Sequence, residues 1–303
     1  MDGVFIIDKP QGMTSHDVVA RVRRVIRVPP SAPKEKVGHA GTLDPMATGV
    51  LPVVVGAATR LVEYLSEADK EYRAAVMLGA TSDTYDREGT ITPTGSFVAP
   101  GLEDVERVLE RFRGEIEQVP PMHSALKVGG KKLYDLARQG IEVERKARRV
   151  TITRLEIEEY APPVLRIVVE CSKGTYIRSL AYDLGAALST GAYLDGLVRT
   201  RVGAFTLEDA VTLEALEKAF AEGTGQERLR PPEAILVGWP VYNVGGAEEQ
   251  AILHGKALQL PDTVPGDKGL IALKGPGGGL LAIAEWDEES GLWQPRKVFG
   301  AGR

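Results

Sequence analysis

The sequence is poor in the residues that build disulfide-bonded and zinc-centred proteins. Its 303 residues include one cysteine, Cys171, which cannot close an intrachain disulfide or supply a cysteine-rich zinc site. The four histidines show no metal-ligand spacing; they are His16, His39, His123 and His254. We therefore expect no metal centre.

Long apolar runs are also missing. No stretch approaches the ~20 consecutive apolar residues that a membrane-spanning helix needs. The opening MDGVFIIDKP places Asp2 and Asp8 around a short apolar segment, which is not the pattern of a secretory signal. Hydrophobic residues make up 43% and charged residues 26%, an ordinary globular balance. The sequence predicts a folded, cytoplasmic protein with no membrane partner.

Familiar cofactor motifs are absent too. There is no GxxxxGK[ST] phosphate loop and no GxSxG serine motif, and GPGGG at 275–279 lacks the spacing of a dinucleotide-binding loop. These absences exclude the commonest nucleotide-dependent and serine-triad chemistries. We expect no small-molecule cofactor.

The overall charge argues at first against a nucleic-acid partner. The formal net charge is −5, yet the segment 122–149 carries 8 basic and 3 acidic residues. Salt screens charges beyond roughly 8–10 Å, so a local excess of positive charge can bind RNA within an acidic protein. The alternative interpretation of this segment is a solvated helix face.

Hydrophobic periodicity predicts interleaved strands and helices without a regular βαβ rhythm. We expect an α+β fold with a mixed, mainly antiparallel central sheet and flanking helices. Strands are predicted at 4–7, 50–56, 70–79, 149–160, 163–171 and near 197–205; helices are predicted after a Thr14 or Ser15 cap, at 102–113 and at about 177–188.

The composition changes near residues 222–232, where EGTGQERLRPP has the glycines and proline pair of a linker. Beyond it, short apolar runs are separated by turn signals, which indicates a small β-rich domain. We divide the chain into a larger unit over 1–225 and a smaller one over 232–303.

A polar, glycine-rich stretch at 36–49, KVGHAGTLDPMATG, joins directly to a predicted buried strand. Pro45 biases Asp44 toward an extended conformation, and the glycines allow close backbone approach. Such a loop holds one carboxylate in a set orientation beside the core. The alternative is an ordinary turn in which Asp44 caps backbone amides.

A second unusual stretch is SKGTYIRSLAYDLG at 172–185. Arg178 falls in the first turn of the predicted helix, where the helix dipole disfavours a cation. A cation there suggests a nearby anion, and Asp44 would fit; the alternative is a surface arginine paired with Asp183. Tyr72 lies on the apolar face of a predicted strand, where plain core packing is the simpler role.

Together, these stretches resemble the TruB family of bacterial tRNA pseudouridine-55 synthases. The resemblance covers residues 1 to about 205, and the C-terminal part is similar in general character to PUA-type RNA-binding domains. It is carried by IDKPQGMTSHDVV, KVGHAGTLDPMATGVLPVVVGAATR, DKEYRAAVMLGATSDTYDREG, PPMHSALKVGGKKLYDLARQG, SKGTYIRSLAYDLG and LVRTRVGAF.

The resemblance implies roles for individual residues. Asp44 matches the family's nucleophilic aspartate, Tyr72 its stacking tyrosine and Arg178 the arginine paired with that aspartate. Tyr176 and Leu197 match positions that line the uracil pocket.

Further matches concern RNA contact. His39 matches the histidine that touches the T-arm where the target base has left the stack. The basic segment at about 122–149 corresponds to a thumb-like insert, in which Lys131 and Lys132 would contact RNA phosphates. Asp86 is a candidate for orienting neighbouring groups, and Arg60 stands where many members carry lysine.

The implied activity is the isomerisation of uridine 55 in the tRNA T-loop to pseudouridine, by base flipping and an essential aspartate. The implied fold is the pseudouridine synthase fold, the implied partner is the tRNA T-arm, and we expect a monomer. One alternative is a non-catalytic chaperone or RNA-binding module that folds tRNA, with Asp44 only structural. Another is a relative of guide-RNA-dependent pseudouridylases, although the thumb-like insert favours a stand-alone enzyme.

Overall fold

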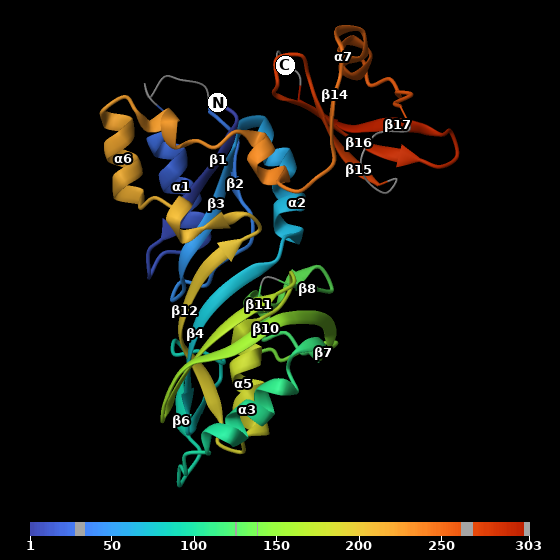
Figure 1. Cartoon of the computed structure of the whole chain (residues 1–303). Coiled ribbons are helices and arrows are strands. Elements are labelled where there is room, and N and C mark those ends of the chain that lie inside the picture. Colours follow the sequence, from blue (N-terminus) through green and yellow to red (C-terminus); the bar gives the residue numbers. More distant parts are fainter. Residues whose placement is uncertain (28–33, 125, 138, 262–268, 300–303) are drawn as a thin grey trace.

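A nine-stranded sheet forms the larger part of the molecule (Figure 1). The computed structural model describes residues 1–27, 34–124, 126–137, 139–261 and 269–299. The sheet contains β1 (Gly3–Lys9), β2 (Val37–His39), β3 (Thr48–Val55), β4 (Lys70–Leu78), β7 (Gly114–Gln118), β10 (Arg148–Ala161), β11 (Val164–Cys171), β12 (Ala192–Val202) and β13 (Phe205–Thr206).

The strands follow the order β1-β3-β12-β4-β11-β10-β7, with β2 attached to β3 and β13 to β12. Every pairing within this sheet is antiparallel except that of β12 with β3, which runs parallel through Val198–Thr48 and Arg199–Gly49. This arrangement confirms the expected mixed, mainly antiparallel sheet.

Helices pack on this sheet from two groups (Figure 1). One group contains α1 (Ser15–Val25) and α6 (Leu213–Ala221), and the other contains α3 (Leu102–Glu110) and α5 (Ile177–Ala187). Helix α1 begins as predicted, because the Thr14 hydroxyl accepts a hydrogen bond from the Asp17 amide and the Asp17 carboxylate accepts one from the Thr14 amide. Shorter helices are η1 (Gly56–Leu61), α2 (Val62–Glu67) and η2 (Leu207–Asp209).

Strand β12 begins earlier than expected. Residues 191–196, GAYLDG, have the composition of a loop and precede the predicted strand near 197–205, but Ala192 and Leu194 already pair with Leu78 and Val76 of β4. The register shifts between Leu194 and Gly196, so one extra residue is accommodated as a bulge. A glycine beside a bulge gives the stretch a loop-like composition although it is a strand.

The stretch at 222–232 has linker composition but is packed. It forms η3 (Gly225–Arg228), and Arg230 exchanges two 2.9 Å backbone hydrogen bonds with Val4 of β1. The next turn, η4 (Pro232–Leu236), packs against β1, η1 and α2. Leu236 then joins Leu61 of the large sheet region and Ile283 of the C-terminal region in one buried cluster.

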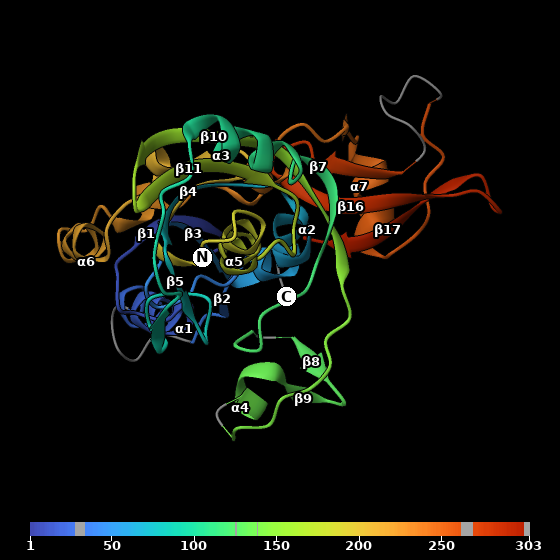
Figure 2. The same ribbon diagram turned by 90° about the horizontal axis from the view of Figure 1, so that it is seen from below.

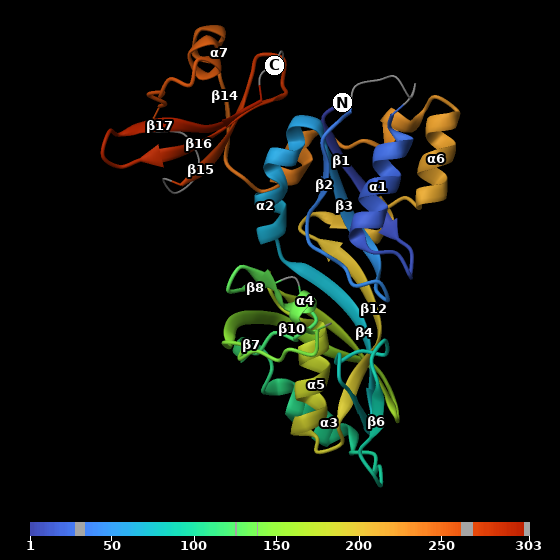
Figure 3. The ribbon, with the colours of Figure 1, turned by 180° about the vertical axis from the view of Figure 1, so that it is seen from behind.

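The C-terminal region forms a second, smaller sheet, which Figure 3 shows beside α2. Its presence confirms the expected small β-rich domain. The elements are β14 (Val241–Asn243), α7 (Gly246–Leu253), β15 (Leu270–Lys274), β16 (Leu280–Asp287) and β17 (Leu292–Val298), with strand order β14-β15-β16-β17.

Two small hairpins extend from the main body. One pairs β5 (Ala80–Ser82) with β6 (Ile91–Pro93). The other pairs β8 (Lys127–Val128) with β9 (Lys131–Lys132) and continues into α4 (Leu133–Ala137); Figure 2 shows it projecting away from the sheet. The side chains of Lys131 and Lys132 lie outside the described part of the structure. Among the described residues, no helix is both long and apolar enough to cross a membrane.

The contact between β3 and β12 depends on one glycine. Gly49 has φ +100°, and a Cβ at this position would lie 2.2 Å from the Arg199 carbonyl oxygen. Gly223, after α6, has a similar φ of +82° but open space around the missing Cβ. The two glycines therefore share a backbone conformation and differ in the space that a Cβ atom would have.

We predict that Gly49→Ala destabilises the protein far more than Gly223→Ala. The positive φ alone costs roughly 1–2 kcal/mol for alanine, and the backbone clash at Gly49 adds about 1–3 kcal/mol because β12 must shift. Urea unfolding of both variants measures the difference. Equal losses of unfolding free energy would contradict this account of the strand contact.

Candidate functional site

A cavity of about 490 Å³ opens where the loop before β3 meets β4, β12 and the start of α5. Five residues singled out in the sequence line it together: Asp44, Tyr72, Tyr176, Arg178 and Leu197. They come from four separate segments of the chain, so the fold brings them together.

The loop that carries Asp44 is fixed on both sides of that residue. Before it, the Ser15 hydroxyl accepts a hydrogen bond from the Leu43 amide (2.8 Å) and donates one to the Leu43 carbonyl (3.1 Å). After it, the Pro45 carbonyl accepts a hydrogen bond from the fully buried Lys9 ammonium at 3.2 Å. The carboxylate is therefore presented by a rigid segment of backbone.

Asp44 and Arg178 form a bidentate ion pair. Arg178 Nε lies 3.0 Å from Asp44 Oδ2, and Nη2 lies 3.1 Å from Oδ1. The Arg178 side chain is 6% exposed and that of Asp44 is 34% exposed. Two parallel charge-assisted bonds fix the orientation of the carboxylate as well as its charge. The anion predicted beside Arg178 is therefore Asp44, not Asp183.

Arg178 has further partners that hold it in place. Its Nη2 donates a 2.7 Å hydrogen bond to the His123 carbonyl, at the base of the 122–149 insert. Its Nη1 lies 3.5 Å from Asp86 Oδ2, and the Asp86 carboxylate accepts hydrogen bonds from the Thr84 hydroxyl and the Glu88 amide. Asp86 thus helps to orient the arginine, in line with its candidate role.

The pKa of Asp44 reflects two opposing effects. Burial raises the pKa of this carboxyl above its ordinary value, and the adjacent Arg178 guanidinium lowers it. The negative charge of Asp86 adds to the upward shift. The net direction is upward, so Asp44 gains a proton at a higher pH than an exposed aspartate does.

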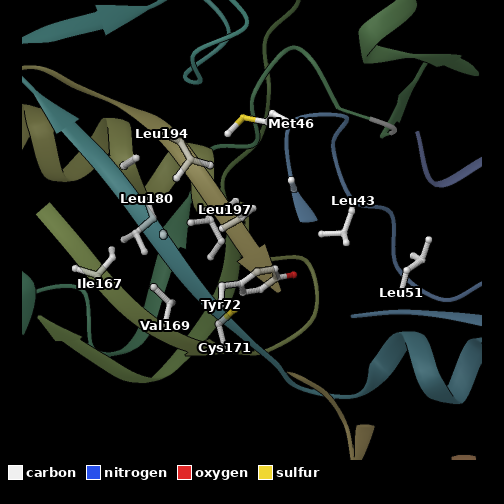
Figure 4. Close-up of a cluster of buried hydrophobic side chains, with 14 of the residues drawn as sticks. Leu43, Met46, Leu51, Tyr72, Ile167, Val169, Cys171, Leu180, Leu194 and Leu197 are labelled. Atoms are coloured by element: carbon white, nitrogen blue, oxygen red, sulfur yellow. The ribbon is translucent and has the colours of Figure 1, made fainter. Parts of the chain in front are cut away.

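Tyr72 projects from β4 into the cavity region. Its side chain is buried, and Figure 4 shows the ring beside Leu197 and Cys171, with the hydroxyl pointing away from Ile167 and Val169. Burial raises the pKa of the Tyr72 phenol, and the Arg199 guanidinium opposes that shift. Burial likewise raises the pKa of the Cys171 thiol to about 11.

Tyr176 immediately precedes α5, and its backbone is fixed by a residue that sequence analysis missed. The Gln118 side chain accepts a hydrogen bond from the Tyr176 amide (2.8 Å) and donates one to the Tyr176 carbonyl (3.1 Å). Gln118 is buried at the end of β7. No local pattern marks it, because its role depends on a contact across 58 residues of sequence.

His39 does not belong to the cavity. It lies on β2, and it is not among the residues that line the cavity. Burial lowers the pKa of its imidazole, with smaller contributions from the charges of Arg199 and His16. Its Nδ1 is buried without a hydrogen-bond partner in the described part of the chain.

Buried cations around the cavity were also missed. Arg199 and Lys70 both line it, and burial lowers the pKa of Lys70 and of the nearby Lys9 to about 8 each. A signal was available for Arg199, because the alternation of β12 places it on the same face as Leu197. No group of three or more His, Cys, Asp or Glu side chains among the described residues could hold a metal ion.

Comparison with known families covers most of the chain. Residues 30–177 match the family model described as TruB family pseudouridylate synthase (N terminal domain). Residues 178–237 match the model described as tRNA pseudouridylate synthase B C-terminal domain.

Among solved structures, the chain is similar to one described as a Cbf5-Nop10-Gar1 complex, with a TM-score of 0.77 and 29% identity over 98% of this chain and 85% of that one. A structure of an H/ACA RNP bound to a substrate RNA containing 2'-deoxyuridine gives a TM-score of 0.75 and 27% identity, with the same coverage of 98% and 85%.

Curated relatives agree with these matches. The tRNA pseudouridine synthase B of Azoarcus sp. (strain BH72) is 46% identical over 99% of this chain and 95% of its own length. The protein of that name from Symbiobacterium thermophilum is 51% identical over 85% of this chain and 83% of its own length. With this coverage, and with Asp44 and Arg178 paired in the cavity, the chain belongs to the TruB family of pseudouridylate synthases.

Proposed function

We propose that this enzyme converts uridine 55 in the T-loop of tRNA into pseudouridine. The observation that carries the proposal is the bidentate Asp44–Arg178 pair, held in one cavity with the Tyr72 ring. The names of the curated relatives support tRNA as the substrate. The T-loop position follows from the resemblance of the motifs around Asp44 and Arg178.

The reaction is an isomerisation. The bond between N1 of uracil and C1′ of the ribose breaks, the base rotates, and a bond forms between C5 and C1′. The C5 proton leaves and N1 gains a proton, so the atoms balance without a co-substrate. The task of the protein is to hold the separated base in place and to supply a base or nucleophile at fixed positions.

Asp44 must be ionised when the reaction begins. As an anion it can attack C1′, attack C6 or remove the 2′ proton, and each route needs the same charged carboxylate. Burial alone would favour the neutral acid, and Arg178 counteracts this effect. The ion pair therefore serves to keep the group charged inside a cavity that a planar base can enter.

The target base must leave the RNA stack to reach Asp44, at a cost of a few kcal/mol. In the proposal, the Tyr72 ring stacks on the flipped uracil, and Tyr176 and Leu197 flank it; these three residues line the cavity. His39, on β2 outside the cavity, is proposed to occupy the space that the base vacates.

RNA binding is assigned to the insert at 122–149. The hairpin of β8 and β9 projects from the body (Figure 2), and the His123 carbonyl at its base contacts Arg178. We propose that Lys131 and Lys132 bind T-arm phosphates, an assignment that rests on the sequence. The proposed catalytic unit spans 1–225 and the proposed PUA-like RNA-binding unit spans 232–303; the enzyme is proposed to act as a cytoplasmic monomer.

The first prediction of this proposal concerns the carboxylate. Asp44→Asn should abolish pseudouridine formation, because the amide can neither attack nor accept a proton, while T-arm affinity stays within about tenfold (~1.4 kcal/mol) of the unchanged chain. Pseudouridine is mapped by nucleotide in unmodified tRNA. The matched control is Asp104→Asn on α3, an exposed carboxylate. Near-normal turnover by Asp44→Asn would favour the non-catalytic RNA-binding alternative.

A second prediction concerns pH. The Arg178 charge lowers the Asp44 pKa, so its removal raises that pKa further and less Asp44 is ionised at a given pH. Arg178→Gln should therefore move the acid limb of the single-turnover pH profile to higher pH, and Arg178→Lys should move it less. An unchanged acid limb with a lowered maximum rate would mean that the arginine does not control Asp44 ionisation.

A third prediction concerns salt. If the insert contacts phosphates, the logarithm of tRNA affinity falls linearly with the logarithm of salt concentration, by about 0.7–0.9 per phosphate neutralised. Changing Lys131 and Lys132 to Ala should flatten this line. Changing Arg107 on α3 and Lys218 on α6 to Ala removes the same amount of charge elsewhere on the protein and should leave the slope unchanged. Identical slopes for both double variants would remove the insert from the interface.

A further inference from the structure

Arg199 is a buried cation with no anionic partner among the residues that the structure describes. It is 1% exposed, and among the described residues no carboxylate lies within ion-pair distance. Its Nε donates to the Val50 carbonyl at 2.8 Å and its Nη2 to the Gly41 carbonyl at 3.1 Å. Burying an unpaired charge is costly, so a group of this kind calls for an explanation beyond packing.

The register of the sheet directs Arg199 at Tyr72. The two residues are direct partners in the antiparallel pairing of β12 with β4, so their side chains lie on the same face. The guanidinium lies near enough to the Tyr72 hydroxyl to lower its pKa against the upward effect of burial, and both side chains line the cavity that holds Asp44. On the other side of β12, Arg199 is opposite Gly49, whose missing side chain leaves room for the β12 backbone.

The neighbouring amines explain why an arginine occupies this position. Lys9 and Lys70 are buried close by, and burial together with the Arg199 charge lowers the pKa of each; both reach about 8. A lysine in place of Arg199 would experience the same burial and lose charge readily. A guanidinium, in contrast to an ammonium, keeps its positive charge when it is buried in a protein.

We propose that Arg199 is a positioning residue of the isomerisation, which holds the Tyr72 hydroxyl over the cavity beside Asp44 and acts through that hydroxyl. The inference rests on the proposed function and assigns the hydroxyl a task within it. Among the described residues, the other titratable groups with the largest effect on the Tyr72 hydroxyl are Cys171 from β11 and Asp44 from the loop before β3; both disfavour a negative charge there. Arg199 favours it.

The step concerned is the loss of the C5 proton after C5 has bonded to C1′. The Tyr72 oxygen takes this proton in the ionised fraction, which the Arg199 charge enlarges against the upward effect of burial on the Tyr72 pKa. The electron pair of the broken C5–H bond forms the C5–C6 double bond. The pair displaced from the N1–C6 double bond then takes up a proton from solvent on N1. Tyr72 afterwards releases its proton to solvent, so protons and electrons balance.

A double-variant cycle tests whether Arg199 acts through the hydroxyl. Single-turnover release of tritium from tRNA labelled at C5 of uridine is measured for the unchanged chain, Arg199→Gln, Tyr72→Phe and the double variant. General acid–base groups contribute about 10²–10⁴ in rate, so Tyr72→Phe should lose at least ~100-fold. Arg199→Gln should lose at least ~10-fold in the unchanged chain but less than about threefold when Tyr72 is already Phe.

The pH dependence of the rate in a lysine variant provides a further test, because a purely structural role of Arg199 would not change it. A control variant accompanies this test. Arg199→Lys should retain more activity at pH 7 than Arg199→Gln and should lose that advantage as pH rises and the lysine deprotonates. The control Arg201→Gln lies two residues further along β12, where Arg201 is paired with Glu170 at 2.7 Å, and it should leave the rate within about twofold.

The outcomes separate this inference from the proposed function. If the unchanged chain forms no pseudouridine, the proposed function fails. If it does, but Arg199→Gln causes the same loss with and without the Tyr72 hydroxyl, Arg199 is structural and only the inference fails.

Thermal melting identifies variants that do not fold, and fluorotyrosine at position 72 then replaces them in a chain that keeps Arg199. Fluorination lowers the pKa of the phenol. The part of the pH–rate profile in which the rate rises as Tyr72 deprotonates should therefore move to lower pH. An unmoved profile would overturn the inference.

Discussion

The ion pair between Asp44 and Arg178 is the constraint on which the rest of the site depends. Its members are separated by 134 residues, so it exists only when the loop before β3 and the first turn of α5 meet. The surrounding polar contacts hold the two segments in the positions that the ion pair requires. Ser15 and Lys9 fix the backbone on either side of Asp44, and the His123 carbonyl and Asp86 fix the guanidinium. The cost of burying a charged pair is reduced because Arg178 also donates hydrogen bonds to the Thr84 and His123 carbonyls.

Three buried cations place positive charge beside the cavity. Lys9, Lys70 and Arg199 are all buried, and each is held by backbone carbonyls; within the described part of the chain, no carboxylate forms an ion pair with them. Carbonyl dipoles satisfy the donors without cancelling the charge, so the field of these cations remains available to an anion. A substrate with a phosphodiester backbone and a developing negative charge on its base suits such surroundings.

Local sequence patterns predicted the long strands β1, β3, β4, β10, β11 and β12, the helices α1, α3 and α5, and the central part of the site. Alternation placed Tyr72 on the buried face of β4, and the misfit of a cation in the first turn of α5 pointed to Asp44. Patterns failed where the cause is distant in sequence: Gln118 matters through its contact with Tyr176. The GAYLDG stretch misled because a bulge admits glycine into a strand. The roles of His39, Lys131 and Lys132 still rest on family resemblance.

The burial of Cys171 has a practical consequence. It is the sole thiol of the chain, it is 1% exposed, and burial raises its pKa to about 11. Because the thiolate is the reactive form, maleimides and similar reagents find no competing target on the folded protein. A cysteine introduced at the exposed Gly129 or Gly130, in the turn between β8 and β9, would therefore carry a single fluorophore. The native chain is thus already a suitable background for following the hairpin by fluorescence while RNA binds.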